Sequence, residues 1–129
     1  MFSVNHDTMA ISLHKGDTGA FTVTMSLQNG DAFVDGDTAI FEVWKGSTRM
    51  MHREFNLQPD EPTYTEYGDG KFLLAFRNSD TDTWEAGSYS TEIRVSLNPI
   101  RSGGKVVDGD TVRTMIQSTL TILGVLIDI

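Results

Sequence analysis

The aspartates of three repeated turns are the side chains best placed to do chemistry. Gly-Asp-Thr occurs three times, each copy before an alternating run, at Gly16-Asp17-Thr18, Gly36-Asp37-Thr38 and Gly109-Asp110-Thr111. With Asp31, Asp35 and Asp108, these carboxylates could supply some of the roughly six to eight oxygens that Ca²⁺ takes. The nearest match to a calcium-binding loop, residues 35–37, lacks the following ligands and the distal glutamate of that motif. Because turn chemistry explains the same glycines and aspartates, we expect no bound metal.

Acid–base or nucleophilic catalysis has only scattered candidates. Three histidines lie far apart, in no metal-binding or catalytic spacing: His6, His14 and His52. Four glutamates could contribute to a carboxylate pair of the kind that glycosidases use: Glu54, Glu66, Glu85 and Glu92. Glu92 falls on the polar face of a predicted strand. The ordinary explanation for a glutamate there is a cross-strand charge pair, with neighbours of Arg94 or with Lys105. Since the chain also has no cysteine and no Gly-x-Ser-x-Gly motif, we expect no enzyme activity, no catalytic residue and no cofactor.

Aromatic residues offer a different kind of site, a platform on which sugar rings stack. Tyr64 and Tyr67 lie in the longest expected loop, residues 58–70, which also holds two of the three prolines. Trp84 and Tyr89 belong to a corner between strands, where packing accounts for them. A carbohydrate-binding or adhesion module that uses Tyr64 and Tyr67 is therefore an alternative to a purely structural role.

Composition argues against several classes of partner. The chain of 129 residues is the size of one domain and has a formal net charge of −8. It has no basic patch to neutralise the phosphates of nucleic acid, and an acidic surface is repelled by anionic membranes. Residues 1–13 lack the pattern of a signal peptide, and the apolar-leaning stretch 120–129 is shorter than the ~20 residues that span a bilayer. We expect one soluble domain, residues 1–129, made in the cytoplasm.

Alternation of apolar and polar residues predicts an all-β chain. In the clearest strand, the odd-numbered residues from Tyr89 to Leu97 form an apolar face and the residues between them a polar one. Further strands are predicted at residues 9–13, 21–27, 39–44, 50–57, 71–77, 105–107 and 111–123. A helix is an alternative prediction only at 111–123, where the many β-branched residues favour a strand. Seven or eight strands with these turns predict an antiparallel two-sheet sandwich, with a small β-barrel as the alternative.

The segment before the strand 89–97 has the pattern of a tight corner, formed by Asp82, Ala86, Gly87 and Tyr89. It resembles the corner before strand F of immunoglobulin-like sandwiches, in which the tyrosine hydroxyl bonds to the backbone just upstream. The resemblance implies an immunoglobulin-like sandwich with Trp84 as the apolar plug of the corner and Trp44 as the candidate for a buried tryptophan of strand C. We also expect one short helical turn, capped by Ser79 or Asp80.

The segment 124–129 is apolar, so we expect it to pack against another strand. After Gly124 come four aliphatic residues and one aspartate, the aliphatic ones being Val125, Leu126, Ile127 and Ile129. Two interpretations stand side by side: a last edge strand of the same sandwich, or an assembly arm that pairs with a neighbouring subunit.

The order of motifs over nearly the whole chain is similar to that of small phage virion proteins of the tail or baseplate, including the N-terminal sandwich domain of upper-baseplate proteins. The motifs are residues 15–18 with 21–23, 36–43, 69–74, 80–89 and 117–122. The chain departs from these proteins in having no long C-terminal extension such as a fibre domain. The resemblance implies a structural or docking role in a phage or prophage virion. The implied partners are other virion or assembly proteins and further copies of the chain, and the resemblance carries over no catalytic residues.

Overall fold

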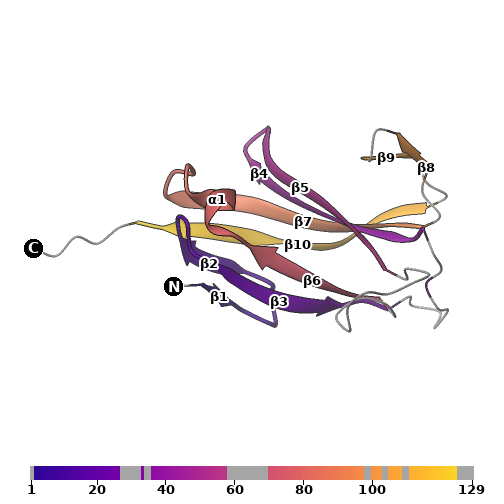
Figure 1. The fold of residues 1–129 in the computed structure, drawn as a ribbon, viewed down its shortest axis with the longest axis horizontal. Helices are drawn as coiled ribbons and strands as arrows, with labels where there is room; N and C mark the ends of the chain where they lie inside the picture. Colours follow the sequence, from indigo (N-terminus) through magenta and orange to yellow (C-terminus); the bar gives the residue numbers. More distant parts are fainter. Residues whose placement is uncertain are drawn as a thin grey trace, which may run out of the picture.

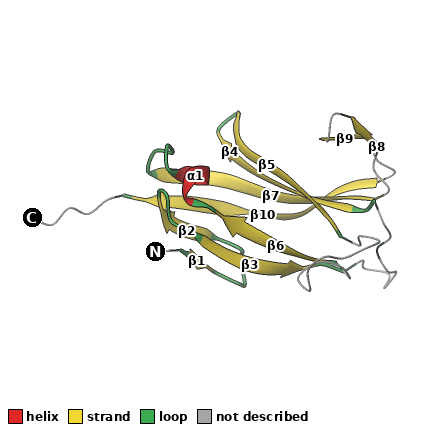
Figure 2. Ribbon diagram, in the orientation of Figure 1, coloured by secondary structure: helices red, strands yellow, loops and turns green. Residues whose placement is uncertain are grey.

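A computed structural model of the chain describes residues 2–26, 33, 36–57, 70–97, 100–102, 105–108 and 111–124. Most of these residues lie in strands, and one short helix stands between β6 and β7 (Figure 1, Figure 2). The elements are β1 (Ser3–Val4), β2 (Ile11–His14), β3 (Gly19–Thr24), β4 (Thr38–Lys45), β5 (Thr48–Asn56), β6 (Lys71–Phe76), α1 (Asn78–Thr81), β7 (Gly87–Leu97), β8 (Ile100–Ser102), β9 (Lys105–Asp108) and β10 (Thr111–Leu123). The described part of the chain contains no helix with the length and hydrophobicity needed to cross a membrane.

The strands form two facing layers and one additional hairpin. A six-stranded sheet has the order β1-β2-β10-β7-β4-β5, β3 pairs with β6 in a second sheet, and β8 pairs with β9 in a third. Strands β4, β7 and β10 share one core with β3 and β6, as strands C, F and G do with B and E in immunoglobulin-like sandwiches (Figure 1). The predicted all-β fold is confirmed.

Three details differ from the sequence-based prediction. The pairing of β2 with β10 is parallel, so the large sheet is mixed and not purely antiparallel. After β2 the chain turns into β3, which belongs to the other sheet. Because β2 and β10 are not joined by a hairpin, they are not forced to be antiparallel. The two-residue strand β1 is unpredicted, and β8 lies within residues 98–104, for which the sequence predicts a turn. With these two additions, the described residues contain ten strands.

Alternation places the apolar side chains between the two layers, as expected. The faces that meet include Ala39, Phe41 and Val43 of β4, Tyr89, Ile93 and Val95 of β7, Leu120 and Ile122 of β10, and Phe72, Leu74 and Phe76 of β6. The ring centroids of Phe41 and Phe76 are 6.2 Å apart in an edge-to-face contact, and those of Phe55 and Phe72 are 4.7 Å apart and stacked. Each fully buried side chain of this size stabilises the fold by about 1.5–3 kcal/mol.

The corner before β7 closes as the sequence predicts. The hydroxyl of Tyr89 donates a hydrogen bond to the backbone carbonyl of Glu85 at 2.7 Å. The ring of Tyr89 stacks on Trp84 with centroids 5.1 Å apart, and Lys45 Nζ lies 4.6 Å from the centroid of the same tyrosine ring. Both Trp84 and Tyr89 are buried, so they serve the architecture of the corner.

Helix α1 starts earlier than expected. It begins at Asn78 with Arg77 as the N-cap, so the prediction of a cap at Ser79 or Asp80 is wrong. Asp80 instead accepts a hydrogen bond from the backbone N–H of Arg77 at 2.6 Å, because a carboxylate at the third helical position can reach back to the free donors of the helix start. Arg53 of β5 binds the same carboxylate, with Nη2 2.6 Å from Oδ2, and thereby ties the corner to the edge of the large sheet.

Gly70, at the entry to β6, is packed too tightly to accept a side chain. Its φ is +81°, and a Cβ atom there would lie 2.1 Å from the carbonyl oxygen of Met25. Gly46, in the turn between β4 and β5, also has a positive φ of +60°, but a Cβ there would meet nothing within 4 Å. We therefore expect Gly70→Ala to reduce the free energy of unfolding by about 1–3 kcal/mol more than Gly46→Ala. Urea denaturation followed by circular dichroism measures the difference, and equal losses in the two variants would contradict the steric argument.

Candidate functional site on the outer face of the sheet

Two rows of side chains cross the outer face of the six-stranded sheet, the face turned away from β3 and β6. The first row contains His52, Glu42, Glu92 and Gln117, from β5, β4, β7 and β10. The second row contains Trp44, Ser90 and Thr119, from β4, β7 and β10. Neighbours within a row are about 5 Å apart, and the rows are about 7 Å apart because two residues along a strand separate them.

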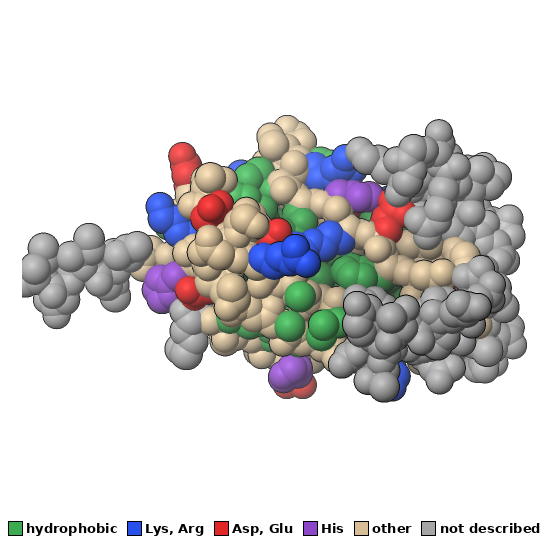
Figure 3. All heavy atoms as spheres, viewed as in Figure 1, with side chains coloured by type: hydrophobic (Ala, Val, Ile, Leu, Met, Phe, Trp, Pro, Cys, Tyr) green, Lys and Arg blue, Asp and Glu red, His purple; other side chains and the backbone are tan. Residues whose placement is uncertain are grey.

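Glu42 is the centre of a charged cluster in the first row. Its side chain is only 4% exposed, and its Oε1 accepts a bond from Arg94 Nη2 at 2.5 Å. Its Oε2 lies 3.1 Å from Arg49 Nη1 and 2.9 Å from His52 Nδ1. Figure 3 shows basic, acidic and histidine side chains side by side over β5. A carboxylate removed from water requires such partners, since an unpaired buried charge is very costly.

His52 joins Glu42 to a second carboxylate. Its Nε2 lies 2.9 Å from Glu54 Oε2, while its Nδ1 contacts Glu42 at the same distance. Ionised carboxylates only accept hydrogen bonds, so both contacts are made at once when each ring nitrogen carries a proton. His52 therefore bridges two acidic residues.

The electrostatics of Glu42 favour the charged form. Burial raises the pKa of Glu42, but hydrogen bonds from His52 and Arg49 and the charge of Arg94 outweigh it, so that the pKa lies below its ordinary value. The carboxylate is therefore ionised at neutral pH and saturated with donors. A saturated carboxylate is poorly suited to act as a general base, and the cluster is better suited to holding β4, β5 and β7 together.

The outer face changes character along the strands. Thr38, Ile40 and Ser96 lie on this face and are buried, with at most 3% of each residue exposed. Towards the corner, Ser90, Gln117 and Thr119 are exposed. The end of the face next to the corner is therefore the part that a ligand can reach.

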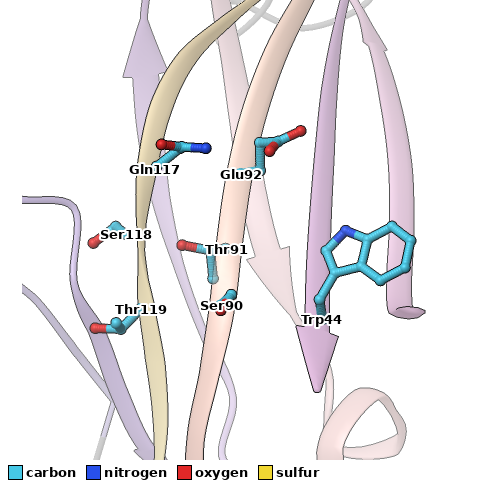
Figure 4. A pocket seen from close by; sticks show the side chains of 7 residues that line it. All are labelled: Trp44, Ser90, Thr91, Glu92, Gln117, Ser118 and Thr119. Carbon is cyan, nitrogen blue, oxygen red and sulfur yellow. The ribbon is translucent and has the colours of Figure 1, made fainter. Parts of the chain in front are cut away.

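A hollow of about 450 Å³ lies at this open end. Its lining comes from Trp44 of β4, from Ser90, Thr91 and Glu92 of β7, and from Gln117, Ser118 and Thr119 of β10. Figure 4 shows the amide of Gln117 directed towards β7, the carboxylate of Glu92 directed towards β4, and the indole of Trp44 with its nitrogen on the side nearer β7. One aromatic ring and several hydrogen-bonding groups thus surround a shallow site across three strands.

Trp44 differs from its expected role. It lies on the outer face and is half-buried, so it is not the buried tryptophan of strand C that the resemblance implies. Its position in the sequence explains this, because it alternates in step with Glu42 and not with Phe41 and Val43. Ile40, Glu42 and Trp44 thus share one side of β4.

The residues singled out as possible interaction sites lie outside the described residues. These are Tyr64, Tyr67, Val125, Leu126, Ile127 and Ile129. The expectations that rest on them therefore stay predictions.

The other candidate residues are not brought together. His14 lies near Asp17, His52 belongs to the Glu42 cluster, and the described residues contain no group of three or more histidines and acidic residues placed to hold a metal. Of the three Gly-Asp-Thr turns, the first two lead into β3 and β4 as predicted, with positive φ at their glycines. The third lies largely outside the described residues. Glu92 pairs with Arg94, whose Nε is 3.0 Å from Glu92 Oε1, in agreement with the ordinary interpretation of this residue.

Glu42 is the residue that sequence reasoning missed. The available signal was weak: a glutamate between two outward-facing apolar residues, Ile40 and Trp44, on a strand whose other face is apolar. Its partners Arg94 and His52 come from two other strands. Only the register of three strands brings these charges together.

Comparison with protein-family models, with curated proteins and with solved structures finds no match to this chain. The fold and the geometry of the outer face therefore carry the functional argument.

Proposed function

We propose that the protein is a structural or interaction module without catalytic activity, a component of the tail or baseplate of a phage or prophage virion. It docks onto neighbouring subunits, which are other virion proteins or further copies of the same chain. The order of turn motifs along the sequence supports the assignment to a virion. The edges of the large sheet support the docking role.

The observation that carries the proposal is the exposed end of β10. Its pairing with β7 ends at Ile122 and its pairing with β2 at Leu123, and its end points away from the sandwich (Figure 1). Leu123 is 37% exposed and is the one large hydrophobic side chain in the described residues that lies on the surface to this degree. The sequence then continues through Gly124 into the mainly aliphatic residues 125–129. An apolar segment that follows an exposed strand end is well suited to pair with the edge of a neighbouring subunit.

The opposite edge of the sheet gives a second support. β5 is nine residues long and is the outermost strand at that edge in the described part of the chain. The free N–H and C=O groups of an edge strand can accept a further strand. Arg49, Arg53 and Glu54 give this edge charges that restrict indiscriminate pairing, so a partner must match them.

Removing residues 124–129 tests the docking role. We expect the full chain to self-associate with rising concentration in light scattering and crosslinking, and the shortened chain to remain monomeric with an unchanged free energy of unfolding. Ile127→Asp should have the same effect as the deletion, because it places a charge in the apolar segment. The neighbouring change Asp128→Asn is the matched control and should leave association intact. A full chain that is monomeric at every concentration, and equally stable after the deletion, would contradict docking through this segment.

A further inference from the structure

The hollow on the outer face has the chemistry of a small binding site. We propose that it binds a neutral pyranose residue of a glycan, with Trp44 as the stacking platform and Ser90, Glu92 and Gln117 as hydrogen-bonding partners. This activity is separate from docking through strand edges and does not depend on it. It assigns sugar recognition to residues of the sheet instead of to Tyr64 and Tyr67.

The indole of Trp44 supplies an apolar surface at the right place. The ring is half-buried and lies on the solvent side of β4, and in Figure 4 it is seen nearly face-on. A pyranose ring has one face made largely of C–H groups, and these pack favourably on the electron-rich face of an aromatic ring. The nitrogen of the indole adds one donor at the edge of the platform nearer β7.

The polar groups around the platform match the hydroxyls of a sugar. Gln117 offers both donors and an acceptor, Glu92 offers two acceptors, and Ser90, next to Trp44 in the second row, offers a hydroxyl. None of the hydrogen bonds found between described residues uses the side chains of Ser90 or Gln117. These groups therefore remain available, and a sugar with adjacent hydroxyls could bond to Glu92 and Gln117 at once.

The charges around the site favour a neutral ligand. Glu92 is held by Arg94, and Arg94 is itself held at 2.5 Å by the buried Glu42, so no free cation faces the hollow from these residues. An anionic sugar would meet the carboxylate of Glu92 and the overall charge of −8. A purely apolar ligand would leave Glu92, Gln117 and Ser90 without their bonds to water, which is unfavourable.

The dimensions agree with one sugar residue in a longer chain. A volume of about 450 Å³ falls in the range of about 300–1,000 Å³ typical of small-molecule sites. The two rows that form the site extend about 10 Å across three strands and about 7 Å along them. Because the site lies on an exposed part of the sheet, the neighbouring residues of a glycan could extend beyond it.

Nuclear magnetic resonance can test the proposal at a single residue. The chain has two tryptophans, so a ¹H–¹⁵N spectrum of the full chain has two indole N–H peaks, from half-buried Trp44 and buried Trp84. The probes are glucose, galactose, mannose and N-acetylglucosamine, each free and as short oligomers, with N-acetylneuraminic acid and a Gly-Ser peptide as comparisons. We expect at least one neutral sugar to shift the Trp44 peak with a dissociation constant in the millimolar range or tighter, and to leave the Trp84 peak in place.

Variants separate a sugar site from a general surface effect. Trp44→Ala should abolish binding on a glycan array, and Gln117→Ala should weaken it by about tenfold, since central anchors carry most of the binding energy. Gln117 is exposed, so its variant should fold normally, and Thr22→Ala on the exposed face of β3 is the matched control with unchanged binding. A Trp44 peak that no neutral sugar moves would overturn the proposal. So would binding that survives both variants, or a response confined to the anionic sugar or the peptide.

Discussion

Replacing Trp84 with alanine is expected to lower the free energy of unfolding by about 3–5 kcal/mol, the usual cost of removing a large aromatic side chain from a core. Only 6% of Trp84 is exposed, and its ring stacks on Tyr89 at 5.1 Å. Its backbone N–H also bonds to the carbonyl of Thr81 at 3.0 Å, which links the end of α1 to the corner. The variant removes the plug of the corner and the stacking contact on the ring of Tyr89.

Two milder variants show whether the loss comes from the plug. Trp84→Phe keeps an aromatic ring and should cost less than the alanine variant. Tyr89→Phe keeps the stacking and removes only the bond to Glu85, which predicts a loss of about 1 kcal/mol. Urea denaturation followed by circular dichroism measures all three variants. A loss below about 1 kcal/mol for Trp84→Ala would mean that the corner collapses around the missing ring and that its role is overestimated.

The faces of the strands could be predicted from the sequence because they depend on local alternation. Tyr89, Ile93 and Val95 lie in the core and Ser90, Glu92 and Arg94 lie on the other face, as the period of two requires. The bond from Tyr89 to Glu85 could also be predicted, since its two groups are four residues apart and belong to a recurring corner. Local geometry was enough in both cases.

The neighbours of a strand could not be predicted in the same way. The parallel pairing of β2 with β10 joins the two ends of the sequence, and no turn motif encodes it. The meeting of Glu42, Arg94 and His52 depends on the register of β4 with both β5 and β7. Alternation places each of these residues on the outer face and says nothing about which strand lies alongside. For the same reason, the hollow beside Trp44 could not be predicted.

The outer face therefore combines two roles. The partners of Glu42 bind β4, β5 and β7 together and leave little for a ligand. Next to this cluster, small and polar residues such as Ser90 and Gln117 leave room beside Trp44. Arg94 links the cluster to the hollow, since it contacts both Glu42 and Glu92. A change in the cluster is therefore expected to affect the orientation of Glu92 in the hollow as well as stability.

Glu42→Ala is expected to lower the free energy of unfolding by about 2–3 kcal/mol. Removing one partner of a buried ion pair costs about 3–5 kcal/mol, because the remaining charge loses its compensation. We expect a smaller value because Arg94 and Arg49 are 32% and 39% exposed at their side chains and regain some contact with water. The double variant Glu42→Leu with Arg94→Met should recover much of the loss, since it replaces the pair with apolar groups of similar size. Urea denaturation at neutral pH gives the three free energies.

The dependence on pH gives an independent check of the same carboxylate. Its pKa is lowered in the folded protein, so its stabilising effect is complete above the ordinary value of 4.5 and is lost as the pH falls through the folded value. The difference in unfolding free energy between the original protein and Glu42→Gln should therefore be constant near neutrality and shrink in acid below pH 4.5. Asp80, whose pKa is also lowered, contributes to both proteins alike and cancels in the difference. A difference that grows in acid, or a double variant no more stable than Glu42→Ala, would show that Glu42 is held by packing and not by its charge.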